Sequence, residues 1–263
     1  MNGWRSFGAA IIVLVFAPPL LLLVSGSLHQ PGRPPPPRPD LVPDPIVTDG
    51  YRAAIEIGGL LRASVNSLAV SAVAVPVSVL VASLAGFALT RVNGRLAGMV
   101  VAASLAALMI PATALLVPKF AMFRALGWTD TLLPLLTPAL LGTSPLYPLV
   151  YYLAFRNVPA DLIDVCRLAD LSPTQVWWRV AMPLVRPVTA AVAALTFVVT
   201  WSNFLDPLVF VYDRDLYTLP LALRSLAALD PTDFPVFLAG AVLATAPALV
   251  VFGVGFLPSW RHR

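Results

Sequence analysis

The sequence has 263 residues, of which 59% are hydrophobic and only 11% are charged, and its formal net charge is +4. Soluble domains usually carry about 25% charged residues, so this composition excludes an ordinary water-soluble globule. The arginines are spread thinly between apolar runs, which favours orientation signals and anionic lipid over nucleic acid as the origin of the basic balance.

Six stretches with few or no charged residues are each long enough to cross a bilayer, which takes about 20 residues. An ionised side chain at the bilayer centre costs about 2.5 to 3.5 kcal/mol, so these stretches mark the spans. The sequence therefore predicts an all-α fold: a polytopic membrane protein, residues 1–263, that forms a single transmembrane domain. The six predicted transmembrane helices are residues 7–28, 63–90, 96–118, 131–155, 187–210 and 234–260.

The first span has features of a secretory signal peptide, because Arg5 precedes it and the small residues Ser25, Gly26 and Ser27 follow it. Its apolar run is longer than the roughly 7 to 15 residues of a signal-peptide core. The length favours a retained helix over a cleaved peptide.

Residues 29–62 form an outer segment between the first two spans. Eight of the fifteen residues from Pro31 to Pro45 are proline, a composition that favours an extended polyproline II spacer and cannot form a helix. A PxxP docking site for a cytoplasmic module is the less favoured alternative, because the predicted topology places this segment outside.

The charges between the spans predict the orientation. With the N-terminus in the cytoplasm, the inner segments hold nine cationic and three acidic residues (+6) and the outer segments eight and ten (−2), which together give +4. The positive-inside rule selects this arrangement, with both termini cytoplasmic and the chain in the cytoplasmic (inner) cell membrane.

Prolines lie within several predicted spans and are expected to kink them, because proline removes a backbone donor. Such kinks suit a bundle that encloses a cavity, although ordinary packing irregularity is an equally good explanation. The prolines concerned are Pro76, Pro111, Pro138, Pro145 and Pro247.

Residues 156–186 are the longest predicted cytoplasmic loop and begin with the pattern of a short helix. Pro159 suits the first helical position, Asp161 suits the helix dipole, and the helix is expected to end near Asp170. Apolar residues recur on one face and charged residues on another. The apolar set is Leu162, Val165, Cys166 and Ala169, and the charged set is Asp161, Asp164 and Arg167.

A second short helix is predicted to follow at once. Ser172 as N-cap, Pro173 at the first position and Gln175 at the third position form a capping box. A short hairpin that projects from the bilayer has an apolar face to bury, which favours docking on a cytoplasmic protein. An interfacial helix lying on lipid headgroups is the alternative.

Several segments, which sample most of the chain, together resemble the permeases of ABC importers, specifically the MalG-like class of the carbohydrate branch. The residues 159–187 resemble the EAA loop of that family. The other segments are Asn66-Ser67, Met109-Ile110-Pro111 with Pro118, Leu126-Gly127 with Thr131, the run from Trp201 to Leu208, and the run from Tyr217 to Pro220.

The resemblance implies a type I importer permease fold in which the loop forms a coupling helix that docks in a groove of a separate ATPase. It implies as partners a second, MalF-like permease subunit, two ABC ATPase subunits and an extracellular solute-binding protein. The residues assigned to ATPase coupling are Asp161, Asp164, Arg167, Leu168, Ala169, Asp170, Leu171 and Ser172.

The loop departs from the family pattern where the helices meet. Asp164 replaces the usual glutamate, and Ala169-Asp170 replaces the usual Asp-Gly pair. The glycine supplies a left-handed turn, and aspartate is one of the few other residues that tolerate this conformation. The bend is therefore expected to survive, and the altered residues bear on the affinity or specificity of ATPase docking, with a dedicated and a shared ATPase as the two alternatives.

No stretch matches the phosphate-binding GxxxxGK[ST] pattern, so this chain is expected to bind no ATP and no metal. We expect ATP and Mg²⁺ to be bound by the partner ATPase. His29 and His262 are isolated and Cys166 has no histidine nearby in sequence, so the chain is not predicted to be an enzyme.

Polar residues near the fifth span are candidates for lining the path of a solute, because an amide and an indole suit sugar hydroxyls and a sugar ring face. An interfacial aromatic belt with satisfied polar neighbours is the alternative. The candidates are Trp201, Asn203, Asp206, Asn66 and Tyr147.

The sequence thus predicts an importer permease that forms half of a translocation path for a sugar or related solute. The alternative is an ion-coupled secondary transporter or a channel that needs no ATPase. Such proteins usually show inverted repeats or ionisable residues within the spans, and the sequence shows neither.

Overall fold

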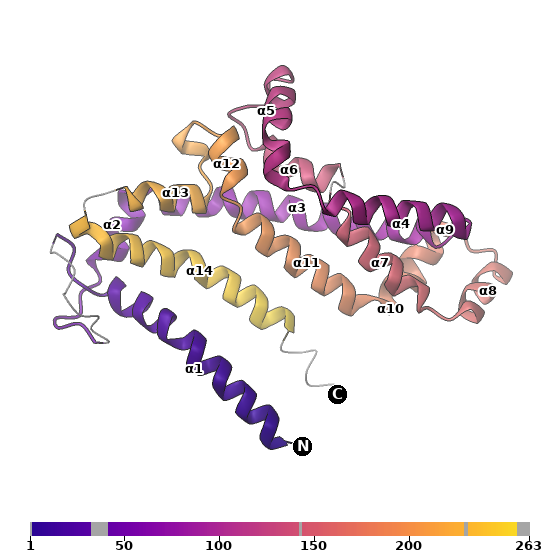
Figure 1. Ribbon diagram of the computed structural model, residues 1–263, viewed down its shortest axis with the longest axis horizontal. Coiled ribbons are helices and arrows are strands. Elements are labelled where there is room, and N and C mark those ends of the chain that lie inside the picture. Colours follow the sequence, from indigo (N-terminus) through magenta and orange to yellow (C-terminus); the bar gives the residue numbers. More distant parts are fainter. Residues whose placement is uncertain (1, 33–41, 142–143, 229–230, 257–263) are drawn as a thin grey trace. The chain divides into compact units, whose positions relative to one another are not determined.

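Figure 1 shows the computed structural model, which is built from helices. The structure describes residues 2–32, 42–141, 144–228 and 231–256. Within these ranges every regular element is a helix, which confirms the all-α prediction. The predicted polyproline II spacer falls largely on residues 33–41, which lie outside the described residues.

The chain divides into two compact units. Unit 1 comprises Met1–Asn66 and Tyr217–Leu249, and unit 2 comprises Ser67–Leu216 and Val250–Arg263. Two long helices contribute residues to both units: α3 (Leu60–Leu89) and α14 (Phe234–Phe256).

Unit 1 is held together by contacts between segments that are distant in sequence. It contains α1 (Asn2–Ser27), α2 (Asp49–Glu56) and α13 (Leu219–Ala227) together with parts of α3 and α14. The buried Ser27 hydroxyl lies 2.7 Å from the Tyr51 hydroxyl at the junction of α1 and α2. Gly50 allows α2 to approach α14, since a Cβ there would lie 3.3 Å from the Pro235 carbonyl oxygen.

Apart from η4 (Pro231–Asp233), which lies in unit 1, the remaining helices belong to unit 2, as do both regions that the sequence singled out. Its helices are α4 (Gly94–Leu108), η1 (Ala112–Leu115), α5 (Leu116–Ala125), α6 (Leu133–Leu140), α7 (Leu146–Arg156), α8 (Ala160–Leu168), α9 (Pro173–Val176), η2 (Trp177–Ala181), α10 (Met182–Leu184), α11 (Arg186–Trp201), η3 (Arg214–Leu216) and α12 (Leu205–Phe210).

Two described helices are long and apolar enough to cross a membrane: Leu60–Leu89 and Phe234–Val251. They match the predicted spans 63–90 and 234–260. Both continue through an internal proline, Pro76 in α3 and Pro247 in α14. The predicted first span corresponds to α1, and the total of six spans stays a prediction.

The predicted span 96–118 is not one continuous helix. α4 ends at Leu108, and the next helical segment, Ala112–Ala125, is bent from it by 89°. Pro111 lies at the break with φ −64° and ψ 130°, an extended conformation that a helix cannot continue through. The kink predicted at this proline is therefore confirmed and is sharper than a simple bend.

Two other predicted spans are also divided. Residues 131–155 form α6, which contains Pro138, and α7, which follows Pro145 as its N-cap. In the segment 187–210, α11 ends at Trp201 and α12 begins at Leu205. The short non-helical stretch between them carries Asn203, one of the predicted site residues.

The core of unit 2 joins α3, α7 and α11 to the segment 160–184. α3 and α7 approach so closely at Gly86 that a Cβ there would lie 2.6 Å from the Tyr151 Cβ, so no larger residue fits. Next to this contact the Phe87 and Phe155 rings meet edge to face at 5.5 Å, a favoured geometry for aromatic pairs. This contact fixes α7, whose end leads into the predicted coupling loop.

Candidate functional site

The first helix of the predicted coupling loop is α8, which begins at Ala160, directly after Pro159. Asp161 lies in its first turn, as predicted, where a carboxylate interacts favourably with the helix dipole. The predicted apolar set is divided between two environments. Cys166 is 4% exposed and packs into the unit, whereas Val165 is 59% exposed.

α8 ends in a left-handed turn at Asp170, whose φ is 52°. The Leu171 N–H donates to the Cys166 carbonyl at 3.1 Å, the long hydrogen bond of a Schellman motif. The sequence prediction that aspartate replaces the family glycine in a left-handed conformation is confirmed. Leu168, which precedes the turn, is 86% exposed.

The second helix, α9, begins with the predicted capping box. The Gln175 N–H donates to Ser172 Oγ at 3.3 Å, and the Ser172 N–H donates to Gln175 Oε1 at 2.8 Å. Pro173 occupies the first turn. The α8–α10 hairpin, defined as residues 160–184, therefore has hydrogen-bonded ends on both sides of its bend.

The α8–α10 hairpin is attached to the unit by a buried apolar cluster. Cys166 from α8 and Val176, Trp177 and Ala181 from the second arm belong to the same cluster as Tyr151 of α7. Trp177 is 8% exposed, whereas its neighbour Trp178 is 64% exposed. One face of the hairpin is thus anchored, and the other presents exposed apolar side chains.

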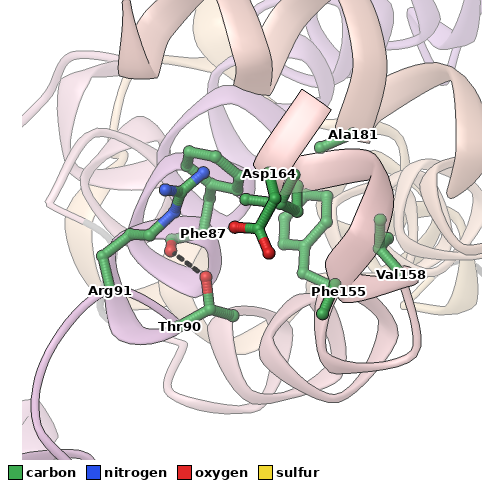
Figure 2. A pocket seen from close by; sticks show the side chains of 9 residues that line it. Phe87, Thr90, Arg91, Phe155, Val158, Asp164 and Ala181 are labelled. Atoms are coloured by element: carbon green, nitrogen blue, oxygen red, sulfur yellow. Dashed lines mark hydrogen bonds between the residues drawn. The ribbon is translucent and has the colours of Figure 1, made fainter. Parts of the chain in front are cut away.

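Figure 2 shows a pocket beneath α8 with a volume of about 190 Å³. The Arg91 guanidinium, from the connection after α3, lies 4.7 Å from the centre of the Phe87 ring. The Asp164 carboxylate lies on the same side of the pocket as Arg91 and Thr90. Asp164 therefore faces the end of α3, whereas the side chain of Arg167 lies outside the described residues.

A polar cluster lies where α11 gives way to α12. The Asn203 side-chain amide donates to Asp206 Oδ2 at 3.0 Å, and the Asp206 N–H donates to Asn203 Oδ1 at 3.3 Å. Lys119 of α5 donates to Asp206 Oδ1 at 3.5 Å, with side chains that are 29% and 16% exposed. We call these three residues the Lys119 cluster.

The other path candidates each have contacts of their own. Trp201 is 5% exposed and stacks on Phe197 with ring centres 5.4 Å apart. Tyr147 packs against the apolar cluster of unit 2, and the Asn66 amide donates to the Tyr217 carbonyl in unit 1 at 3.0 Å. Their predicted role in the solute path stays a prediction.

Lys119 was not among the predicted site residues. The available signal was its rarity, since it is the only lysine of the chain and follows Pro118 at the edge of a predicted span. Its partner Asp206 is 87 residues away, so no local pattern connects them.

A second link between distant segments lies near this cluster in sequence. Asp130, with φ 60°, accepts hydrogen bonds through Oδ1 from the N–H groups of Tyr212 and Asp213 at 2.9 and 2.8 Å. These two backbone hydrogen bonds, that from Asp213 first, lower the pKa of the Asp130 carboxyl below its ordinary value.

The broken apolar helices and the anchored hairpin define an all-helical fold with helices long and apolar enough to cross a membrane. A solved structure of the same fold is titled "Crystal structure of a bacterial ABC transporter involved in the import of the acidic polysaccharide alginate". The match covers 95% of this chain and 95% of the matched chain, with a TM-score of 0.76 and 19% sequence identity. A similarity of this kind shows the fold alone.

Residues 74–257 match the family model described as "Binding-protein-dependent transport system inner membrane component". The chain belongs to this family, and it is an inner-membrane permease subunit. This confirms the family resemblance seen in the sequence.

Curated relatives include the lactose transport system permease protein LacG of Rhizobium radiobacter, 28% identical over 71% of this chain and 68% of LacG. The trehalose transport system permease protein SugB of Mycobacterium tuberculosis is 26% identical over 80% of this chain and 77% of SugB. The melibiose/raffinose/stachyose import permease protein MelC of Bacillus subtilis is 22% identical over 93% of this chain and 88% of MelC.

Proposed function

We propose that this chain forms half of the path for a sugar in an ABC importer and receives the motion of a separate ATPase through the α8–α10 hairpin. The complex comprises a second permease subunit, two ATPase subunits and an extracellular solute-binding protein. ATP and Mg²⁺ are bound by the ATPase subunits, and both termini of this chain lie in the cytoplasm.

The observation that carries this proposal is the rigid attachment of an exposed apolar surface. Leu168, Val165 and Trp178 are 86%, 59% and 64% exposed. Large apolar side chains that are exposed in this way favour a protein partner. The hairpin behind them is capped at its bend and packed on α7 and α11. Force applied at this surface is therefore transmitted to helices of the membrane domain.

Sugar as the solute is supported by the printed names of the relatives, which specify lactose, trehalose and melibiose, raffinose or stachyose. The Lys119 cluster offers an amide, a carboxylate and an ammonium group in close proximity. Groups of these kinds donate to and accept from hydroxyls. Asn203 and Asp206 are thus the path candidates that we retain first.

The test is purification of the tagged chain from its native membranes in mild detergent, followed by identification of the proteins that co-elute in stoichiometric amount. We expect an ABC ATPase and a second permease. A chain that is recovered alone or as a homo-oligomer, with uptake that follows an ion gradient and survives ATP depletion, would contradict the proposal and favour a secondary transporter.

The variant Leu168→Asp tests the hairpin directly. Because Leu168 is 86% exposed, the substitution leaves the fold intact, but it places a charge in the apolar docking surface. A docking residue of this kind contributes about 2 kcal/mol, so we expect a roughly 30-fold weaker association with the ATPase. Leu168→Met is the matched control and retains association; equal association of Leu168→Asp and Leu168→Met would exclude the hairpin as the docking element.

A further inference from the structure

A groove of about 630 Å³ runs between α4 and α7 and shares Thr90 with the pocket that α8 helps to line. Its body is apolar and is formed by Val101 and Leu105 of α4 and by Leu149 and Leu153 of α7. Its other end carries the polar groups of Arg156 and Thr90, with Leu89 and Val92 beside Thr90 in the same lining. The groove is therefore complementary to an amphipathic ligand, which has one apolar and one polar part.

The polar end carries a positive charge. Arg156 is the last residue of α7, and its guanidinium lies 5.7 Å from the centre of the Tyr152 ring. Gly94, the first residue of α4, lines the same groove, so the positive end of the α4 dipole adds to the charge of the guanidinium. Acidic side chains are absent from the lining that the structure describes. The electrostatics of this end select an anion.

The floor of the groove is open because two of its residues are glycines. A Cβ at Gly94 or Gly98 would meet no atom within 4 Å, so no part of the described chain fills this space. The apolar part of the groove along α4 runs from Gly98 to Leu105, over which the helix rises about 10 Å, whereas one leaflet contributes about half of the roughly 30 Å hydrocarbon core of a bilayer. The apolar part thus fits within the acyl region of one leaflet.

We propose that the α4–α7 groove is a binding site for an anionic phospholipid. The phosphate lies against Arg156 and the first turn of α4, and one acyl chain lies along Gly98, Val101 and Leu105. Charge complementarity favours this occupant over an apolar helix of a partner subunit, because such a helix would leave the guanidinium without a counter-charge.

The test measures thermal unfolding of the purified, delipidated importer complex with added dioleoyl phosphatidylglycerol or dioleoyl phosphatidylcholine. Because a ligand that binds the folded state raises the midpoint, we expect phosphatidylglycerol to raise it by roughly 3 °C more than phosphatidylcholine does. The variant Gly98→Leu fills the groove and abolishes this difference. The variant Arg156→Gln reduces it by at least about half, since the acyl contacts remain.

Two control variants separate the groove from general effects of lipid. Ala102→Leu introduces the same side chain at an exposed position of α4 outside the groove lining, and Arg179→Gln removes an arginine outside it. Both should retain the full difference between the two lipids. Wild-type selectivity in Gly98→Leu, or equal stabilisation of the wild-type complex by both lipids, would overturn the proposal.

Two further outcomes would also overturn it. If glycerol phosphate alone reproduces the effect of phosphatidylglycerol, the site binds a free phosphate ester and needs no acyl chain. If Gly98→Leu releases the second permease subunit while lipid selectivity is unchanged, the groove is a subunit interface.

Discussion

The α8–α10 hairpin and the Lys119 cluster are both held in fixed geometry, but by different forces. In the hairpin the bend is formed by neighbours in sequence, a capping box at Ser172 and a left-handed Asp170, and Trp177 then packs the hairpin on the apolar core of unit 2. In the Lys119 cluster the order comes from charged side chains on separate helices. We therefore expect the hairpin to move as one body. The ion pair of the Lys119 cluster instead joins two helices, α5 and α12, that can separate when the pair breaks.

The largest expected effect concerns the anchored face of the hairpin. Trp177→Ala removes an 8% exposed indole from the apolar cluster and should lower the free energy of unfolding by about 3 to 5 kcal/mol. Trp178→Ala, at a 64% exposed position, should change it by less than about 0.5 kcal/mol. Thermal unfolding of the two variants checks this, and equal losses would show that the cluster does not anchor the hairpin.

The Lys119 cluster should respond less strongly. Lys119→Met leaves the 16% exposed Asp206 carboxylate without its cation, and we expect a loss of about 1 to 2 kcal/mol. A double-mutant cycle with Asp206→Asn should yield a coupling energy of similar size.

The pair Arg52–Glu56 on α2 provides a matched control for this cycle. Its side chains are 81% and 61% exposed, so its coupling energy should be below about 0.5 kcal/mol. If the two cycles give the same coupling energy, the Lys119 pair behaves as an ordinary surface contact and does not link α5 to α12.

The left-handed turn of the hairpin predicts effects of opposite sign at one position. Asp170→Gly removes the steric cost of φ 52° and should stabilise the protein by up to about 1 kcal/mol, whereas Asp170→Ala should destabilise it by about 1 kcal/mol. Gly127→Ala, at φ 69°, should destabilise its own turn, between α5 and α6, by a similar amount. Stabilisation by Asp170→Ala in denaturant unfolding would contradict the left-handed assignment.

The smallest effect is a pH dependence of the link made by Asp130. Its pKa is lowered in the folded state by the Asp213 and Tyr212 N–H groups, so the stabilisation is present above the unfolded pKa of about 3.9 and is lost as pH falls through the lower folded pKa. Hydrogen exchange of the two amides should therefore be unchanged by acidification from neutral pH until about pH 4, apart from the intrinsic exchange chemistry.

The control for this prediction is Asp130→Asn. Asparagine tolerates a left-handed conformation and keeps a side-chain oxygen as acceptor, but it does not titrate. In this variant, protection of the Tyr212 and Asp213 amides should not decrease when the pH is lowered below about 4. A fall of the same size in both proteins would assign the effect to another group.

Much of the fold and of the hairpin was predictable because the signals are local. The spans now seen as α3 and α14 follow from hydropathy alone, and the starts of α8 and α9 follow from Pro159 and the capping box. The position of the sharp break before η1 was predicted, at Pro111, but its angle was not. The 89° bend depends on which helices pack on either side of the proline.

The sequence by itself determined the membrane class, the two-helix pattern of residues 156–186 and the family resemblance, since each depends on residues close together in the chain. Only the tertiary structure decided that Cys166 faces inward while Leu168 faces outward, and that Lys119 meets Asp206. The reason is physical: which side of a short helix is buried, and which distant charges pair, depends on the packing of other helices.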